Sequence, residues 1–119
     1  MAGCLCAPLA YTFLVIIVET SIFTRQVTSL LTDEEYREFQ LLLAEQPDLG
    51  KVIKGGNGLR KARWAPKGRG KSGGVRMIYY WVVRQDRILM LFMYPKSERS
   101  DLTPEQIKVL GRIVKEEYP

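Results

Sequence analysis

Basic side chains at alternate positions are the feature of this sequence most able to do chemistry. Lys61 and Arg63 are separated by one residue, and Arg76 lies in the next segment with strand character. Because alternate residues of a strand point to the same face, Lys61 and Arg63 share one surface of any sheet they join. An antiparallel pairing of the two segments would bring Arg76 to that surface, within reach of the same phosphate.

Three cations around one phosphate are suited to cleaving RNA without histidine. Neighbouring positive charges disfavour the protonated form of Lys61, which favours the neutral amine that a general base requires. Lys61 would then take the proton of a ribose 2′-OH, while Arg63 and Arg76 stabilise the pentacovalent phosphate. The alternative is that the three residues only bind nucleic acid, as cations on an exposed face of a sheet often do.

Positive charge is concentrated in the middle of the chain. The 119 residues include 18 Lys+Arg and 13 Asp+Glu, a net charge of +5. The segment Lys54–Arg87 holds ten basic residues and one acid, giving +9, whereas the remainder, with eight basic residues and twelve acids, gives −4. Such a cluster is typical of a nucleic-acid binder, although an acidic protein partner would satisfy the same field.

A glycine-rich basic loop, Pro66–Gly74, lies within this segment. It lacks the spacing of a Walker loop and precedes a strand rather than a helix, which excludes that kind of nucleotide hydrolysis. We interpret it as a cationic finger that holds RNA, the alternative being a flexible hairpin loop. Tyr80 shares a face with Arg76 and is a candidate for stacking on an unpaired base. The RNA-binding residues predicted in this region are Arg60, Lys67, Arg69, Lys71 and Tyr80.

The composition excludes several other classes of protein. Histidine is absent and the two cysteines, Cys4 and Cys6, are one residue apart. These counts exclude Ser-His-Asp chemistry, an ordinary zinc site and a disulfide scaffold, so we expect no metal and no cofactor. The low use of cysteine favours a reducing compartment, which predicts a cytoplasmic protein.

The length predicts a single domain, residues 13–119, preceded by a flexible extension at residues 1–12. Ala2–Val18 carries no charge but is short for a membrane span, so we expect no membrane association. A signal peptide is the alternative interpretation of this run. Its dense β-branched part, Phe13–Val18, predicts a buried strand.

Two helices follow, the second opened by a capping box at Thr32 with Glu35. Three strands and a helix that begins after Thr103 complete the chain. The predicted strands are Leu59–Ala65, Val75–Val83 and a central Ile88–Tyr94. The order β-α-α-β-β-β-α predicts an α+β fold, with two N-terminal helices and a C-terminal helix packed on one twisted, mainly antiparallel sheet.

Several stretches together resemble the RelE/HigB family of bacterial toxins, and the HigB-like subgroup with an extended basic loop most of all. They are Gly58-Leu-Arg-Lys-Ala-Arg63, the run from Lys67 to Tyr80, the run from Tyr94 to Thr103, the Ile22-Phe23 helix and the segment Leu31–Phe39. The resemblance spans about residues 13 to 116. It implies a RelE-like fold and a metal-independent endoribonuclease that cuts messenger RNA in the ribosomal A site by 2′-OH attack. It also implies a cognate antitoxin, of helix-turn-helix type, as partner.

The resemblance assigns roles by position. The sheet lysines of the family fall on Lys61 and Arg63, and its strand arginine on Arg76. Its later arginine falls on Ser97 and its tyrosine on Thr103, so we expect Lys96 or Arg99 to supply the missing charge. Tyr80 or Tyr94 would supply the missing aromatic ring. Two other functions stay open: a non-catalytic toxin of the same superfold that poisons DNA gyrase, and a simple RNA- or ribosome-binding module.

Overall fold

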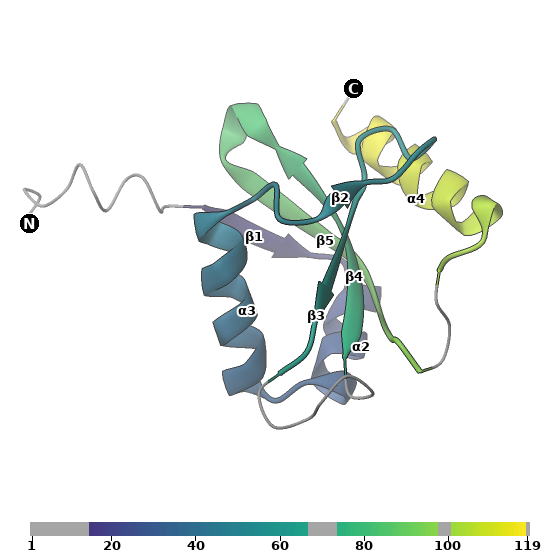
Figure 1. Cartoon of the computed structure of the whole chain (residues 1–119). Helices are drawn as coiled ribbons and strands as arrows, with labels where there is room; N and C mark the ends of the chain where they lie inside the picture. Colours follow the sequence, from purple (N-terminus) through teal and green to yellow (C-terminus); the bar gives the residue numbers. More distant parts are fainter. Residues whose placement is uncertain (1–14, 67–73, 98–100, 119) are drawn as a thin grey trace, which may run out of the picture.

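A computed structural model describes residues 15–66, 74–97 and 101–118 and shows an α+β fold (Figure 1). The elements are β1 (Ile16–Glu19), α2 (Ser21–Leu30), α3 (Asp33–Glu45), β2 (Lys51–Val52), β3 (Arg60–Trp64), β4 (Val75–Val82), β5 (Arg87–Pro95) and α4 (Pro104–Glu117). The predicted fold class and order are confirmed. The short strand β2 is an addition to the predicted order.

The helices α2, α3 and α4 each begin where a threonine caps the first turn. The hydroxyls of Thr20, Thr32 and Thr103 accept hydrogen bonds from backbone N–H groups three residues ahead. At Thr32 and Thr103 the third helical residue returns the hydrogen bond, which completes a capping box. The starts of α3 and α4 are therefore determined by local sequence, as predicted, and the cap of α2 at Thr20 is an addition to the prediction.

The five strands form one mixed sheet in the order β1-β5-β4-β3-β2. Strand β1 runs parallel to β5, and every other pairing is antiparallel. Strand β5 is interior as expected, but the middle of the sheet is β4. A register shift between Ile78 and Tyr79 interrupts the β4–β5 pairing.

The sheet is covered on both faces, because alternate residues of its strands enter two different cores. Ala62, Met77 and Tyr79 pack with Phe23 of α2 and Phe39 of α3 in one core. The second core, on the opposite face, holds Leu59, Ile78, Leu89, Leu91, Tyr94, Leu102 and Val114, the last from α4. Figure 1 shows α3 and α4 on opposite sides of the strands. Helix α4 covers only part of its face, since Lys61 is half-buried and Arg63 is exposed there.

Strand β2 is held against β3 by a close backbone approach at Gly50. A Cβ atom at this position would lie 2.9 Å from the backbone carbon and oxygen of Lys61. The buried Tyr79 hydroxyl accepts a hydrogen bond from the Gly50 N–H at 2.8 Å and donates one to the Pro47 carbonyl at 2.6 Å. Burial raises the pKa of Tyr79, which keeps the hydroxyl protonated for this donation.

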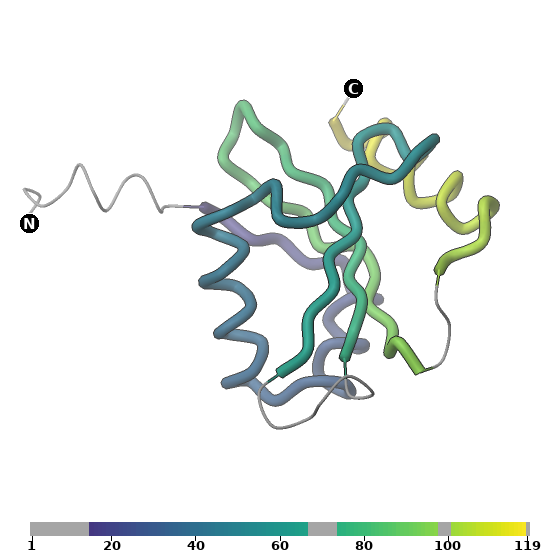
Figure 2. The backbone as a smooth tube through the Cα atoms, in the orientation of Figure 1, coloured from purple at the N-terminus to yellow at the C-terminus, as the bar shows by residue number. Residues whose placement is uncertain are grey.

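The turn between β2 and β3 is fixed by glycines and by α4. Gly55 and Gly58 have φ angles of 78° and 95°, which glycine adopts without strain. A Cβ atom at Gly111 of α4 would come within 3.2 Å of the Gly56 carbonyl oxygen, so helix and turn are in close contact. Figure 2 shows this teal turn beside the yellow helix.

Several predictions concern residues outside the described ranges. The extension at residues 1–12, the first two residues of the predicted Phe13–Val18 strand and most of the loop Pro66–Gly74 belong there. Within the described part, that strand begins at Ile16 and runs one residue further, to Glu19. In the same part, no helix has the length and apolar character needed to cross a membrane.

Tyr79→Phe is expected to lower the free energy of unfolding by about 1–3 kcal/mol, because it leaves the Pro47 carbonyl and Gly50 N–H without their partner. Urea unfolding followed by circular dichroism measures the change. Tyr80→Phe is the matched control, since the Tyr80 hydroxyl makes no hydrogen bond with the described residues. Equal stability losses in the two variants would contradict the role assigned to the Tyr79 hydroxyl.

Candidate functional site

Two cross-strand pairs of cations lie on one face of the sheet. Arg63 of β3 lies directly opposite Arg76 of β4, and Lys61 lies opposite Lys51 of β2. Directly paired residues of antiparallel strands share a face, so all four point to the side that α4 partly covers. The predicted grouping of Lys61, Arg63 and Arg76 on one face is therefore what the register produces.

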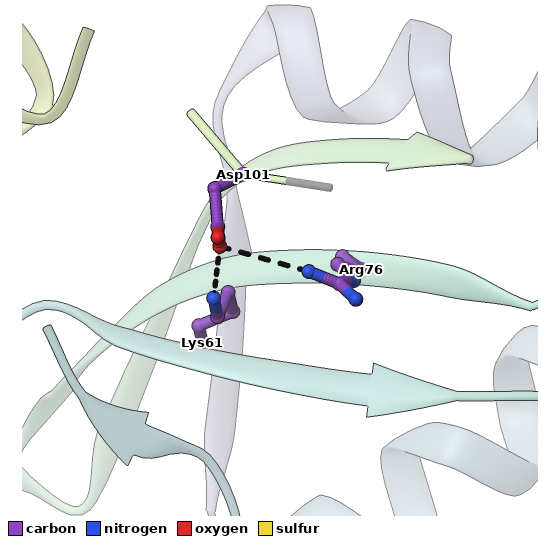
Figure 3. A network of polar contacts seen from close by, with 3 residues as sticks. All are labelled: Lys61, Arg76 and Asp101. Carbon is purple, nitrogen blue, oxygen red and sulfur yellow. Dashed lines mark hydrogen bonds and ion pairs between the residues drawn. The ribbon is translucent and has the colours of Figure 1, made fainter. Parts of the chain in front are cut away.

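Arg76 is the only buried charged residue in the described part of the chain, with 6% of its surface exposed. Burying a guanidinium is costly unless an opposite charge lies nearby. That charge is Asp101, which precedes α4 by three residues. One Asp101 carboxylate oxygen accepts a hydrogen bond from the Lys61 ammonium and lies 3.6 Å from Nη1 of Arg76 (Figure 3).

The carboxylate of Asp101 responds to all three cations. Its hydrogen bond from Lys61 and the charges of Lys61, Arg76 and Arg63 hold the pKa of Asp101 below its ordinary value of 3.8. The Asp101 side chain is nevertheless 61% exposed. Exposed ion pairs contribute little to stability, so this carboxylate can be displaced at low cost. Asp101 was not among the residues predicted from the sequence, although it lies two residues before the capping residue Thr103.

The position of Asp101 marks where an anion fits. One Asp101 carboxylate oxygen contacts both Lys61 and Arg76, so an oxyanion placed there could contact the same two cations. Asp101 itself is a weak base because its pKa is lowered, and efficient general bases have a pKa near the working pH. The Lys61 ammonium is engaged by Asp101, so it can contact a substrate only when this carboxylate moves away.

A small hollow adjoins this cluster at the ends of β3 and β4. Its volume is about 170 Å³, and Arg63, Arg76 and Lys96 are the cations that line it. Lys96 is exposed, and its backbone N–H donates to the Gly74 carbonyl at 3.0 Å. Of the two residues expected to replace the missing family arginine, Lys96 thus lies beside the cluster, and Arg99 is outside the described residues.

The other predicted contacts are placed differently. Arg60 lies opposite Tyr79, hence on the far face from Lys61, and donates to the Gly50 carbonyl at 2.8 Å. Tyr80 shares the Arg76 face but stacks on Tyr118, with ring centroids 6.0 Å apart. Lys67, Arg69 and Lys71 lie outside the described residues. RNA binding by these five residues stays a prediction.

Ser97 and Thr103 stand where the family pattern has an arginine and a tyrosine, and both lie in the described part of the chain. Ser97 is exposed just after β5, and Thr103 caps α4. Tyr94, the other candidate for the missing aromatic ring, is 3% exposed and lies opposite Arg76. No group of three or more potential metal ligands occurs in residues 15–66, 74–97 and 101–118.

A sequence model of the family described as the RelE toxin of the RelE / RelB toxin–antitoxin system matches residues 46–118, which include β2 to α4. The chain belongs to the RelE toxin family. Members of this family are components of toxin–antitoxin systems, as the family description states.

A solved structure shares the fold of this RelE family member. It is the free state of the E. coli toxin RelE with two arginines replaced by alanine. The likeness has a TM-score of 0.58 at 10% identity and covers 83% of this chain and 95% of the other. At that identity the comparison supports the fold alone.

The titration of Asp101 tests the ion pair directly. Because its pKa is lowered, the contact with Lys61 is complete above the ordinary value of 3.8 and is lost as the pH falls through the lower folded-state value. Carbon-13 NMR of the Asp101 carboxyl is expected to give a pKa below 3.8 in the wild type. In Lys61→Met the value should rise. An unchanged value in Lys61→Met would contradict the pairing.

Asp101→Asn removes the carboxylate that contacts Lys61 and Arg76, which is expected to leave this position open to another anion. We expect inorganic sulfate to bind about two- to five-fold more tightly to this variant. This ratio corresponds to the free energy that an exposed ion pair contributes. The Arg76 side-chain NMR signal reports the binding. Glu116→Gln, which removes the same charge from an exposed position on α4, is the control and should leave the affinity nearly unchanged. Equal affinities of Asp101→Asn and wild type would show that Asp101 does not occupy the anion position.

Proposed function

We propose that the chain is a toxin of the HigB-like subgroup that cleaves messenger RNA in the ribosomal A site. One observation carries this proposal: Lys61, Arg63 and Arg76 all act on the carboxylate of Asp101, at a position fit for a phosphate. A cluster that neutralises one anion from several sides is suited to a phosphate whose charge grows in the transition state.

The reaction assigned to the site is transfer of the phosphate to the neighbouring 2′-oxygen. The substrate phosphate displaces Asp101, and the neutral amine of Lys61 takes the 2′-OH proton as the 2′-oxygen bonds to phosphorus. Arg76 and Arg63 stabilise the pentacovalent phosphate. The bond to the 5′-oxygen then breaks and that oxygen takes a proton from water. The hydroxide left behind takes the proton from Lys61, and the products are a 2′,3′-cyclic phosphate and a 5′-hydroxyl. No metal takes part in these steps.

The ribosome supplies what this small site lacks. No aromatic ring of the described part lies exposed beside Lys61 and Arg76, because Tyr94 is buried and Tyr80 packs on Tyr118. We therefore assign the orientation of the message to the A site. The proposed partners are the ribosome, messenger RNA and a cognate antitoxin of helix-turn-helix type, which would hold the toxin inactive.

Lys61→Gln is expected to lower message cleavage in a translating extract by about 10²–10⁴-fold, because it removes the general base. Primer extension on the message locates and quantifies the cuts. Lys67→Ala with Lys71→Ala should instead weaken ribosome binding and flatten its salt dependence, with slower cleavage only at low toxin concentration.

Lys108→Gln, which removes one charge from the exposed side of α4, is the matched control. Intact message at full ribosome occupancy by the wild type would refute the nuclease. If the message stays intact while DNA damage signalling rises, the gyrase-poisoning function replaces it. Uncut message, no damage signal and no growth arrest would leave a binding module.

A further inference from the structure

A second basic hollow lies next to the cluster, on the side away from Lys96. It has a volume of about 510 Å³, between β2, β3 and the turn that joins them. Four of its lining residues are cations, and none is acidic: Lys51, Lys54, Lys61 and Arg63. Arg63 lines this hollow and the smaller one, so the two are continuous along β3.

The described residues balance only part of the positive charge of this hollow. Lys51 is paired directly with Lys61 across the β2–β3 ladder, a like-charge pair that disfavours the strand pairing. Among the described residues, the ion pairs of Asp101 are those with Lys61 and Arg76. Within the described residues no acid pairs with Lys51, Lys54 or Arg63. An external anion is therefore the group that relieves this repulsion.

The hollow is also built on fixed elements. Gly50 lets β2 approach β3, and the Tyr79 hydroxyl secures Gly50 from the opposite face of the sheet. The turn that carries Lys54 is hydrogen-bonded from Ile53 to Leu59 at 2.8 Å and contacts Gly111 of α4. The backbone positions of Lys51 and Lys54 are thus set before a ligand arrives, which lowers the entropy cost of binding.

We propose that the hollow lined by Lys51, Lys54 and Arg63 binds a second phosphate of a single-stranded RNA, one or two nucleotides from the phosphate held at Lys61 and Arg76. The proposal rests on the function assigned above. Strands are about 4.8 Å apart, so Lys51 lies two strand spacings, about 10 Å, from β4. That distance leaves room for a separate phosphate. The RNA backbone therefore runs across the sheet, from β4 over β3 to β2.

RNA suits this surface better than an acidic protein segment. The cations continue without a break from the phosphate position at Arg76, as a regularly charged backbone requires. The remaining lining side chains, Leu49, Val52 and Ile53, offer apolar surface on which a base or ribose can rest. Phosphate contacts of this kind position the strand without reading its sequence.

The test uses 2′-O-methyl RNA, which lacks the attacking hydroxyl and cannot be cut. Affinities of the full chain for a dinucleotide and a hexanucleotide are measured by NMR and fluorescence anisotropy over a range of salt. Lys51→Gln with Lys54→Gln should weaken hexanucleotide binding about tenfold and reduce the salt slope by about 1.4, the value for two single-strand phosphate contacts. Dinucleotide binding should stay unchanged.

Lys108→Gln with Lys115→Gln removes the same charge from exposed positions of α4 and serves as control. If both double variants weaken the hexanucleotide equally, the effect is one of net charge and the proposal is overturned. It is also overturned if Lys51→Gln with Lys54→Gln loses binding of a polyglutamate peptide while RNA affinity is kept. A length-dependent loss together with an uncut message in the extract would support the second phosphate site and refute the nuclease.

Discussion

Repulsion between Arg63 and Arg76 is the interaction that the rest of the structure has to balance. The two residues are directly paired across β3 and β4, Lys61 shares their face, and like charges in such positions disfavour strand pairing. The core on the other face, where Ala62 and Met77 pack with α2 and α3, holds the strands together against this force. Asp101 offsets part of the charge locally. A stable sheet can therefore present cations that an anion from outside would stabilise further.

Local signals in the sequence account for most of the fold. The capping boxes at Thr32 and Thr103 involve residues three apart, so both helix starts could be predicted without tertiary knowledge. Strand β2 could not, because two residues are too few for an alternating pattern to be recognised. Its place depends on contacts of Gly50 with Lys61 and Tyr79, which are distant in sequence.

The site, like the fold, could be predicted from the sequence only in part. Alternation along β3 places Lys61 and Arg63 on one face, and the register of β3 against β4 adds Arg76. Charge counting also grouped Arg60 with them, although alternation assigns it to the far face, where it bonds to Gly50. Asp101 could not be predicted, because its approach to Lys61 depends on where the segment before α4 crosses the sheet.

The pairing of β1 with β5 has a consequence for the order of events during synthesis. Ile16 is the partner of Arg87, so the first strand of the sheet has no neighbour until the fifth has been made. Asp101 follows Arg76 by a further 25 positions. At ordinary elongation rates that interval lasts roughly one to five seconds. The cations of β3 and β4 thus leave the ribosome ahead of the carboxylate that offsets part of their charge, and each nascent chain carries them without Asp101 for that time.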